Sequence, residues 1–159
     1  MAINLEELAR FLVKAKSQTY AGDGREVPSQ RPGFKELQFA EGDWNYRDSY
    51  AGFYFAPGQE VVRFQGGLVW VMAYSGGMRS EHHGRREFAQ QTFKFLKKAL
   101  QRVEQSRPFR GPENFHEDEW EYRDSSEGDA TDFKGTEHIL YNGDEVFRQH
   151  YMGGVILSK

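Results

Sequence analysis

Two nearly identical segments, 41–49 and 117–125, each end in Arg-Asp-Ser after a Trp-x-Tyr sequence. Side chains alternate between the faces of a strand, so Asp48 shares a face with Trp44. A carboxyl group beside aromatic rings is desolvated, which suits it to act as a general acid or to anchor a cationic or hydroxylated ligand. It can also cap the turn after the strand. Because Asp124 repeats Asp48 in the second segment, the structural role as a turn cap is favoured. Both interpretations stay open.

Glu60 opens a later apolar segment and is the carboxylate that could work together with Asp48. A pair of carboxyl groups is the usual equipment of acid–base hydrolysis, and the distance between the groups decides the mechanism. The sequence sets no such distance, and an exposed glutamate at the start of a strand is the plainer interpretation. The sequence therefore assigns no catalytic residue. A hydrolase-type enzyme that uses Asp48 and Glu60 stays open as an alternative.

Aromatic residues are concentrated in the first half of the chain, while the matching positions of the second half are often polar. A larger core in the first half would explain the difference. A cleft with aromatic walls and a few polar groups would explain it equally well. Trp70 and Tyr74 share one face of an alternating strand and would form an apolar floor with one hydroxyl. The candidate ligand-binding residues are Asp48, Tyr54, Glu60, Trp70 and Tyr74.

The chain contains five histidines and no cysteine, so it has neither disulfides nor thiolate metal sites. His82 and His83 are adjacent in a glycine-flanked loop, where metal binding would be adventitious. No pair of histidines has the i, i+4 spacing of a helical zinc site. Nucleophile-elbow, P-loop and dinucleotide-binding motifs are also absent from the sequence. We therefore expect no metal site and no cofactor.

The 159-residue chain carries a formal net charge of −3, and 15% of its residues are aromatic. This composition predicts a packed globular unit without a general attraction to nucleic acid or to an anionic membrane. Residues 1–16 have acidic side chains where a signal peptide has basic ones, and no following apolar run could cross a bilayer. We expect a cytoplasmic protein with a small-molecule ligand as partner, and the oligomeric state stays open.

The elements that must position these residues occur twice. Asn4 is a suitable N-cap for a first helix, and apolar residues at helical spacing predict a second helix over 86–103. Strand-like segments follow each helix. The sequences at 65–67 and 142–144 predict tight hairpin turns. The glycine-rich segment 75–86 predicts a loop that links the two copies.

The two halves match residue by residue over 41–49 and 117–125, and again, after a one-residue insertion, from Glu60 and Glu137 onward. Such ordered matches indicate an internal duplication. The sequence therefore predicts an α+β fold of two repeated helix-plus-antiparallel-strand modules, αβββ(β) twice, related by a pseudo-twofold axis. The predicted modules are residues 1–80 and 81–159, packed as one compact unit.

Segments 11–22, 41–52 and 68–78 resemble an uncharacterised bacterial family catalogued as a domain of unknown function, sometimes found behind an XRE-type helix-turn-helix. We expect no such DNA-reading module in this sequence, because few residues precede Leu5. The resemblance implies a sensory or interaction role and supplies no catalytic residue. We therefore expect a non-catalytic small-molecule-binding or regulatory module. The alternatives are the hydrolase-type enzyme and a protein-interaction module.

Overall fold

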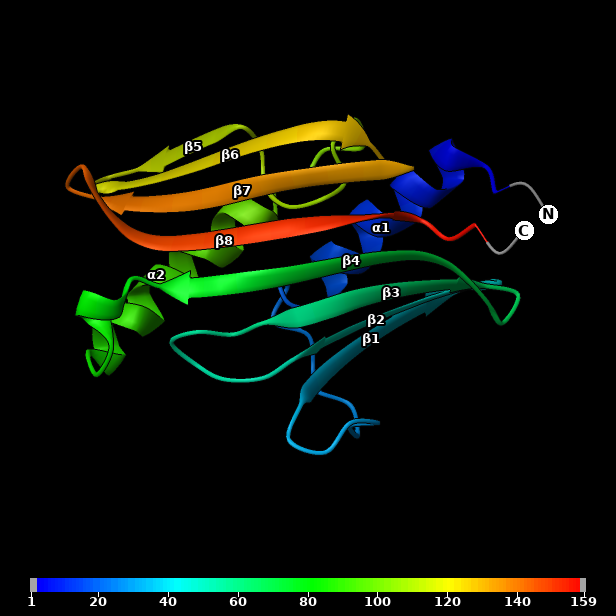
Figure 1. Ribbon diagram of the computed structural model, residues 1–159, viewed down its shortest axis with the longest axis horizontal. Helices are drawn as coiled ribbons and strands as arrows, with labels where there is room; N and C mark the ends of the chain where they lie inside the picture. The colour runs from blue at the N-terminus through cyan, green and yellow to red at the C-terminus, as the bar shows by residue number, and fades with distance from the viewer. Residues whose placement is uncertain (1–2, 158–159) are drawn as a thin grey trace.

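The computed structural model describes residues 3–157, and Figure 1 shows its elements. Within that range, two α-helices, α1 (Leu5–Gln18) and α2 (Arg86–Leu100), and the short 3₁₀ helix η1 (Ser80–His82) accompany eight strands. The strands are β1 (Lys35–Glu41), β2 (Trp44–Tyr50), β3 (Gly58–Phe64), β4 (Gly67–Met78), β5 (Asn114–Glu117), β6 (Trp120–Asp129), β7 (Asp132–Tyr141) and β8 (Asp144–Val155). Neither α-helix of this range has the length and apolar composition needed to cross a membrane.

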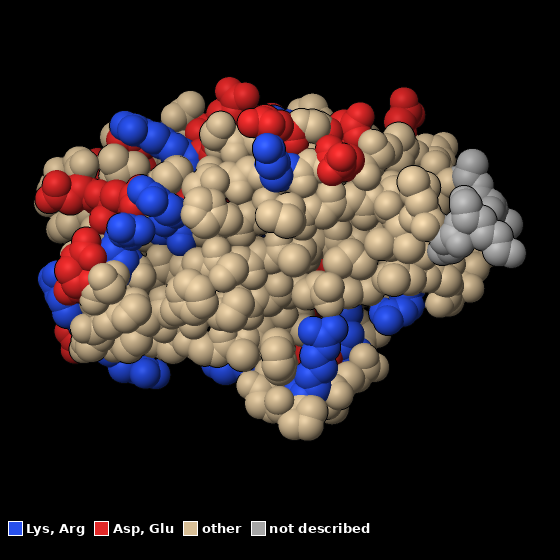
Figure 2. Space-filling model, in the orientation of Figure 1, with Lys and Arg blue, Asp and Glu red and all other residues tan. Residues whose placement is uncertain are grey.

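The strands form one antiparallel sheet in the order β1-β2-β3-β4-β8-β7-β6-β5. β4 and β8 are neighbours at its centre, where Tyr74 lies directly opposite Tyr151. Both α-helices lie behind the sheet in Figure 1, so they cover the same face. The opposite face carries a band of uncharged side chains over β4 and β8, with charged side chains gathered along its margins (Figure 2).

The predicted fold class, two αβββ(β) modules related by a pseudo-twofold axis, is wrong. Residues 3–157 form mainly one continuous sheet of eight strands, accompanied by two short α-helices. The halves are joined by main-chain pairing over Trp70–Met78 and Phe147–Val155. The alternation of apolar and polar side chains identifies strands, but it does not show which strands pair with one another. The modules 1–80 and 81–159 stay a prediction, and their first two and last two residues lie outside the described range.

Local signals placed several elements correctly. The side-chain oxygen of Asn4 accepts the amide protons of Glu6 and Glu7 at 3.0 and 3.2 Å, so α1 begins where the sequence predicts. The helix predicted over 86–103 ends earlier, at Leu100. The loop predicted over 75–86 is partly wrong, because 75–78 continue β4 along β8.

The glycines of this β4 segment permit a close approach between neighbouring chains. A Cβ atom on Gly76 would overlap the carbonyl oxygen of Arg148, and one on Gly77 would overlap that of Tyr54. The sheet can therefore pack tightly at this point, where it forms the floor of a cavity.

Candidate ligand-binding cleft

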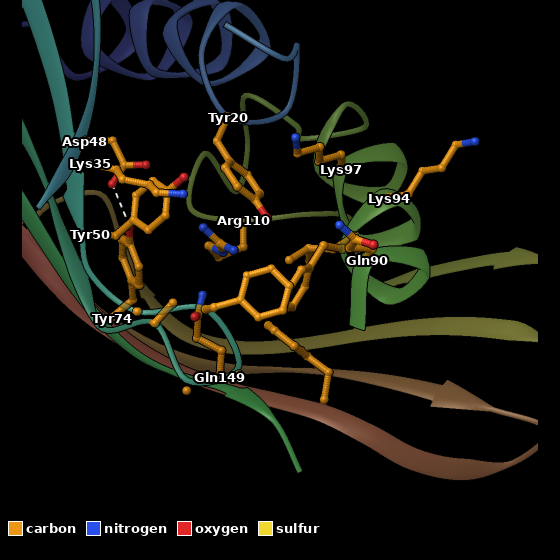
Figure 3. A pocket seen from close by; sticks show the side chains of 18 of the residues that line it. Tyr20, Lys35, Asp48, Tyr50, Tyr74, Gln90, Lys94, Lys97, Arg110 and Gln149 are labelled. Carbon is orange, nitrogen blue, oxygen red and sulfur yellow. Dashed lines mark hydrogen bonds between the residues drawn. The ribbon is translucent and has the colours of Figure 1, made fainter. Parts of the chain in front are cut away.

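A cleft of about 450 Å³ opens on the helix-covered face of the sheet (Figure 3). Its floor is formed by β4 and β8, one wall by α2, and the other by β1, β2 and the segment that follows β2. Several aromatic rings line it: Tyr20, Tyr50, Phe53, Tyr74, Phe93 and Phe147. The size and the mixture of rings with a few polar groups are typical of a site for a small molecule.

Two of the predicted ligand-binding residues meet in this cleft. The hydroxyl of Tyr74 donates a 2.6 Å hydrogen bond to Oδ1 of Asp48, and both residues belong to the lining. Asp48 is only 4% exposed, and its carboxyl accepts from a side chain of another strand. Within residues 3–157 it accepts no backbone amide, so the interpretation of Asp48 as a turn cap is wrong.

Glu60 is close to this pair but does not reach the cleft. The strand register places Asp48 opposite Glu60. The Glu60 carboxylate is nevertheless buried beneath α1, where it pairs with the Lys16 ammonium group. The interpretation of Glu60 as an exposed strand-start residue is therefore wrong.

The other two predicted residues lie outside the cleft lining. Trp70 is fully buried in the core, where its ring stacks on Phe133 at a centroid distance of 5.6 Å. It shares a face with Tyr74, as expected, but lies further along the sheet, close to the Lys16 side chain of α1. Tyr54 is half-buried and stacks on His83 at 5.5 Å. We therefore assign neither residue to the cleft.

A buried ion cluster centred on Arg110 supports the cleft from one side. The Arg110 guanidinium donates to Glu137 Oε1 from Nε at 2.9 Å and from Nη2 at 2.7 Å. Its Nη1 lies 3.8 Å from Oε1 of Glu60. Burial lowers the pKa of Lys16, the second cation of the cluster, and its pairing with Glu60 opposes that shift. The cluster thus joins α1, the segment before β5 and both halves of the sheet.

A Tyr-Asp pair also occurs in the second half of the sheet. The Tyr151 hydroxyl lies 2.8 and 2.9 Å from the two carboxylate oxygens of Asp124. Opposite Tyr151 on the neighbouring strand stands Gly135, and a Cβ atom there would overlap the tyrosine ring. Gly58 has the same relation to Tyr74. In each pair, the glycine gives the ring the space to reach its aspartate.

The two aspartates resist ionisation. Burial and the nearby charge of Glu60 raise the pKa of Asp48 to about 7, while the Tyr74 hydrogen bond opposes the rise. Burial and the charge of Glu137 raise the pKa of Asp124 to about 7 as well. The aspartate pKa in an unfolded chain is about 4. The stability that each protonated acid contributes is therefore complete below about pH 4 and is lost as the pH rises through about 7.

Much of the cleft lining was not predicted from the sequence. Arg110 lies in the irregular segment between α2 and β5, where no periodicity fixes the direction of a side chain. A recognisable signal was the repeated glutamate, because two glutamates that are buried in the ionised form need a cation close to them. The other cleft residues of the second half were not predicted either: Gln90, Phe93, Lys94, Leu96, Lys97, Phe147 and Gln149.

Metal ligation finds no support in the described part of the chain, where no three His, Asp or Glu side chains converge as a metal site requires. The adjacent histidines have other contacts. His83 Nε2 lies 3.0 Å from the Met78 carbonyl oxygen, and the ring of His82 packs against Phe88 at 5.1 Å.

The family model described as "Domain of unknown function (DUF5680)" matches residues 48–156, which is more than half of the chain. The matched span begins at Asp48 and includes Tyr74, Arg110 and Gln149 of the cleft. No curated protein and no solved structure matches the chain. Since the family description assigns no activity, the function has to be inferred from the cleft.

Proposed function

The chain belongs to the family described as a domain of unknown function, DUF5680, and we propose that it is a non-catalytic small-molecule-binding or regulatory module. The observation that carries the proposal is the buried carboxyl group of Asp48. One of its oxygens accepts the Tyr74 hydroxyl, while the other faces a cavity of about 450 Å³ with aromatic walls (Figure 3). A buried polar group directed into a cavity with aromatic walls is suited to fix the orientation of a ligand.

A regulatory role is supported by the origin of the cleft walls. The segment after α1 contributes Tyr20, whereas α2 contributes Gln90 and Phe93 from the other half of the chain. A ligand between them would stabilise that arrangement, and the stabilisation would grow with the logarithm of the ligand concentration divided by its Kd once the site is mostly occupied. The bacterial source, the cytoplasmic location and the occurrence of relatives behind an XRE-type helix-turn-helix belong to this proposal, as does the absence of nucleic-acid and membrane partners.

The internal duplication is likewise part of the proposal. It is supported by the strand registers, which pair Asp48 with Glu60 and Asp124 with Glu137. Only the first of these aspartates lines the cleft. The duplicated framework would then serve the fold in both halves and ligand binding in one.

The alternative enzyme would use Asp48 and Glu60 as its carboxyl pair. It is favoured by their direct opposition in the sheet and by the Asp48 pKa of about 7, which suits a general acid. Acid–base hydrolysis also needs a second carboxylate that faces the substrate. The Glu60 carboxylate is instead engaged with Lys16 and Arg110, away from the cleft. This arrangement favours binding over catalysis.

A protein-interaction module is favoured by one feature of the open face of the sheet. Figure 2 shows an uncharged band over β4 and β8, and the exposed apolar residues of these two strands are Leu68, at 43% exposure, and Met152, at 60%. A partner would contact this band, whereas a small molecule would contact the cleft on the other face. The two proposals therefore differ in which amides a bound molecule perturbs.

A fragment screen followed by amide NMR spectra tests the proposed function. Bound fragments are expected to shift the amide signals of Gly52, Gly76 and Gly77, which line the cleft. The signals of Gly66 and Gly143, in distant hairpin turns, should not move.

Two tryptophan variants of neighbouring residues on α2 make the test specific. Gln90 and Gln91 are both exposed, but only Gln90 belongs to the cleft lining. Gln90→Trp should fill the cleft and abolish fragment binding, while Gln91→Trp should leave it unchanged. Equal binding by both variants, or no fragment in the cleft at millimolar concentration, would overturn the proposal.

A further inference from the structure

The buried aspartate of the cleft lacks the cation that its counterpart has. In the second half of the sheet, Nη2 of Arg107 donates to Oδ2 of Asp124 at 3.1 Å. Among the residues that the structure describes, no Lys or Arg side chain lies within ion-pair distance of Asp48. Its Oδ1 accepts the Tyr74 hydroxyl, and its Oδ2 is directed into the cleft without a hydrogen bond from residues 3–157.

The sequence counterpart of Arg107 is engaged elsewhere. Arg31-Pro32 matches Arg107-Pro108 in the repeat. Nη2 of Arg31 donates to the Gln59 side chain at 2.8 Å, and its guanidinium lies 5.7 Å from the ring of Phe34. Arg31 therefore does not pair with Asp48 in the way that Arg107 pairs with Asp124. The corresponding position beside Asp48 belongs to the cleft.

The cationic side chains of the cleft lining either have an acidic partner other than Asp48 or point away from the cavity. Arg110 is held by Glu60 and Glu137. Lys97 and Lys35 each have an acidic partner, at 2.5 and 3.9 Å. The ammonium group of Lys94 points away from the cavity in Figure 3. Asp48 thus remains as the buried charge of the cleft whose second oxygen is open to a ligand.

We propose that the cleft binds a small organic cation, a guanidinium, amidinium or ammonium group on an aromatic or apolar body, and that this cation pairs with Asp48 as Arg107 pairs with Asp124. The inference rests on the proposed function of the cleft as a ligand site. A charge-assisted hydrogen bond to a buried carboxylate is stronger than a neutral one. Tyr20 and Tyr50, whose ring centroids are 6.1 Å apart, supply aromatic surface beside the cation.

Binding of the cation should depend on pH, because the cation prefers the ionised form of Asp48. The groups that face Asp48 from the surrounding elements are Lys16 of α1, Tyr20 of the segment after α1, Lys35 of β1, Tyr46 and Tyr50 of β2, Glu60 of β3, Tyr74 of β4 and Arg110. Glu60 pairs with Lys16 and Arg110 within one cluster, which leaves Asp48 as the acid available to the ligand.

Benzamidine, benzamide and benzoate test the inference, since they share a ring and differ in the charge of its substituent. Amide NMR titrations of the whole protein at about pH 8 measure their affinities for the cleft. Benzamidine is expected to bind at least about tenfold more tightly than benzamide, a difference of about 1.4 kcal/mol, and benzoate more weakly than both. Asp48→Asn should remove the advantage of benzamidine, and Asp124→Asn, outside the cleft, should retain it.

The outcomes separate this inference from the proposed function. The inference of a cationic ligand is wrong if benzamide or benzoate binds the cleft as tightly as benzamidine. It is also wrong if benzamidine alone fails to bind where other fragments bind. In both cases the ligand site stands. If no fragment binds the cleft, both fail. Should Asp48→Asn not fold, the wild type still decides: benzamidine affinity must rise from about pH 6 to about pH 8, and benzamide affinity must not. A flat benzamidine profile overturns the inference.

Discussion

Replacing Arg110 by methionine should lower the free energy of unfolding by about 3–5 kcal/mol. Methionine fills much of the space but leaves the buried carboxylates of Glu60 and Glu137 without the guanidinium between them. An uncompensated buried charge is among the most destabilising changes a substitution can make. Urea denaturation followed by circular dichroism measures the loss.

An exposed arginine provides the matched control. Arg123 pairs with Glu121 at 2.7 Å on the surface, where water screens the pair, so Arg123→Met should cost far less stability than Arg110→Met. Combining Arg110→Met with Glu137→Gln should recover part of the lost stability, because it removes the carboxylate charge that loses its cation, whereas Glu60 keeps Lys16. A loss for Arg110→Met no larger than that of the Arg123 control would contradict the buried cluster.

Trp70→Ala should cost about 3–5 kcal/mol in the same measurement. The Trp70 ring is fully buried against Phe133, and its Nε1 donates to the carbonyl oxygen of Ala130 at 3.2 Å. Removing the ring leaves a cavity beneath α1 that the rigid sheet cannot fill. Because Trp70 does not line the cleft, the folded variant should retain fragment binding.

Trp44 is the appropriate comparison for Trp70. It is half-buried at the edge of the core, where it stacks on Phe11 at 5.3 Å. Trp44→Ala should therefore cost less than Trp70→Ala. Equal losses, or a loss of fragment binding in folded Trp70→Ala, would show that the assignment of Trp70 to the core is wrong.

Features set by neighbouring residues were predictable from the sequence. Asn4 caps α1 as predicted, because its side chain needs only the amides of the first turn. The two hairpin turns are also confirmed. Gln65 and Asn142 each take a positive φ, near 50°, followed by Gly66 and Gly143 at 80° and 85°. That geometry is the turn that Asn-Gly sequences favour between strands.

Features set by contacts between distant segments were not predictable. β4 pairs with β8, a strand from the other half of the chain. The sequence pattern of a strand does not show which distant strand it pairs with. For the cleft, alternation correctly placed Asp48 and Tyr74 on the inner faces of their strands. It could not show that α2 would form the opposite wall, or that Arg110 would reach the centre from an irregular segment.

The most direct test of cation binding at Asp48 is the titration of the Asp48 carboxyl carbon by NMR, with and without saturating benzamidine. In the free protein its pKa is expected at about 7, because the group is buried beside Glu60. Benzamidine paired with Asp48 should lower that pKa, since a cation stabilises the ionised form. An Asp48 pKa that does not change on saturation would contradict the account.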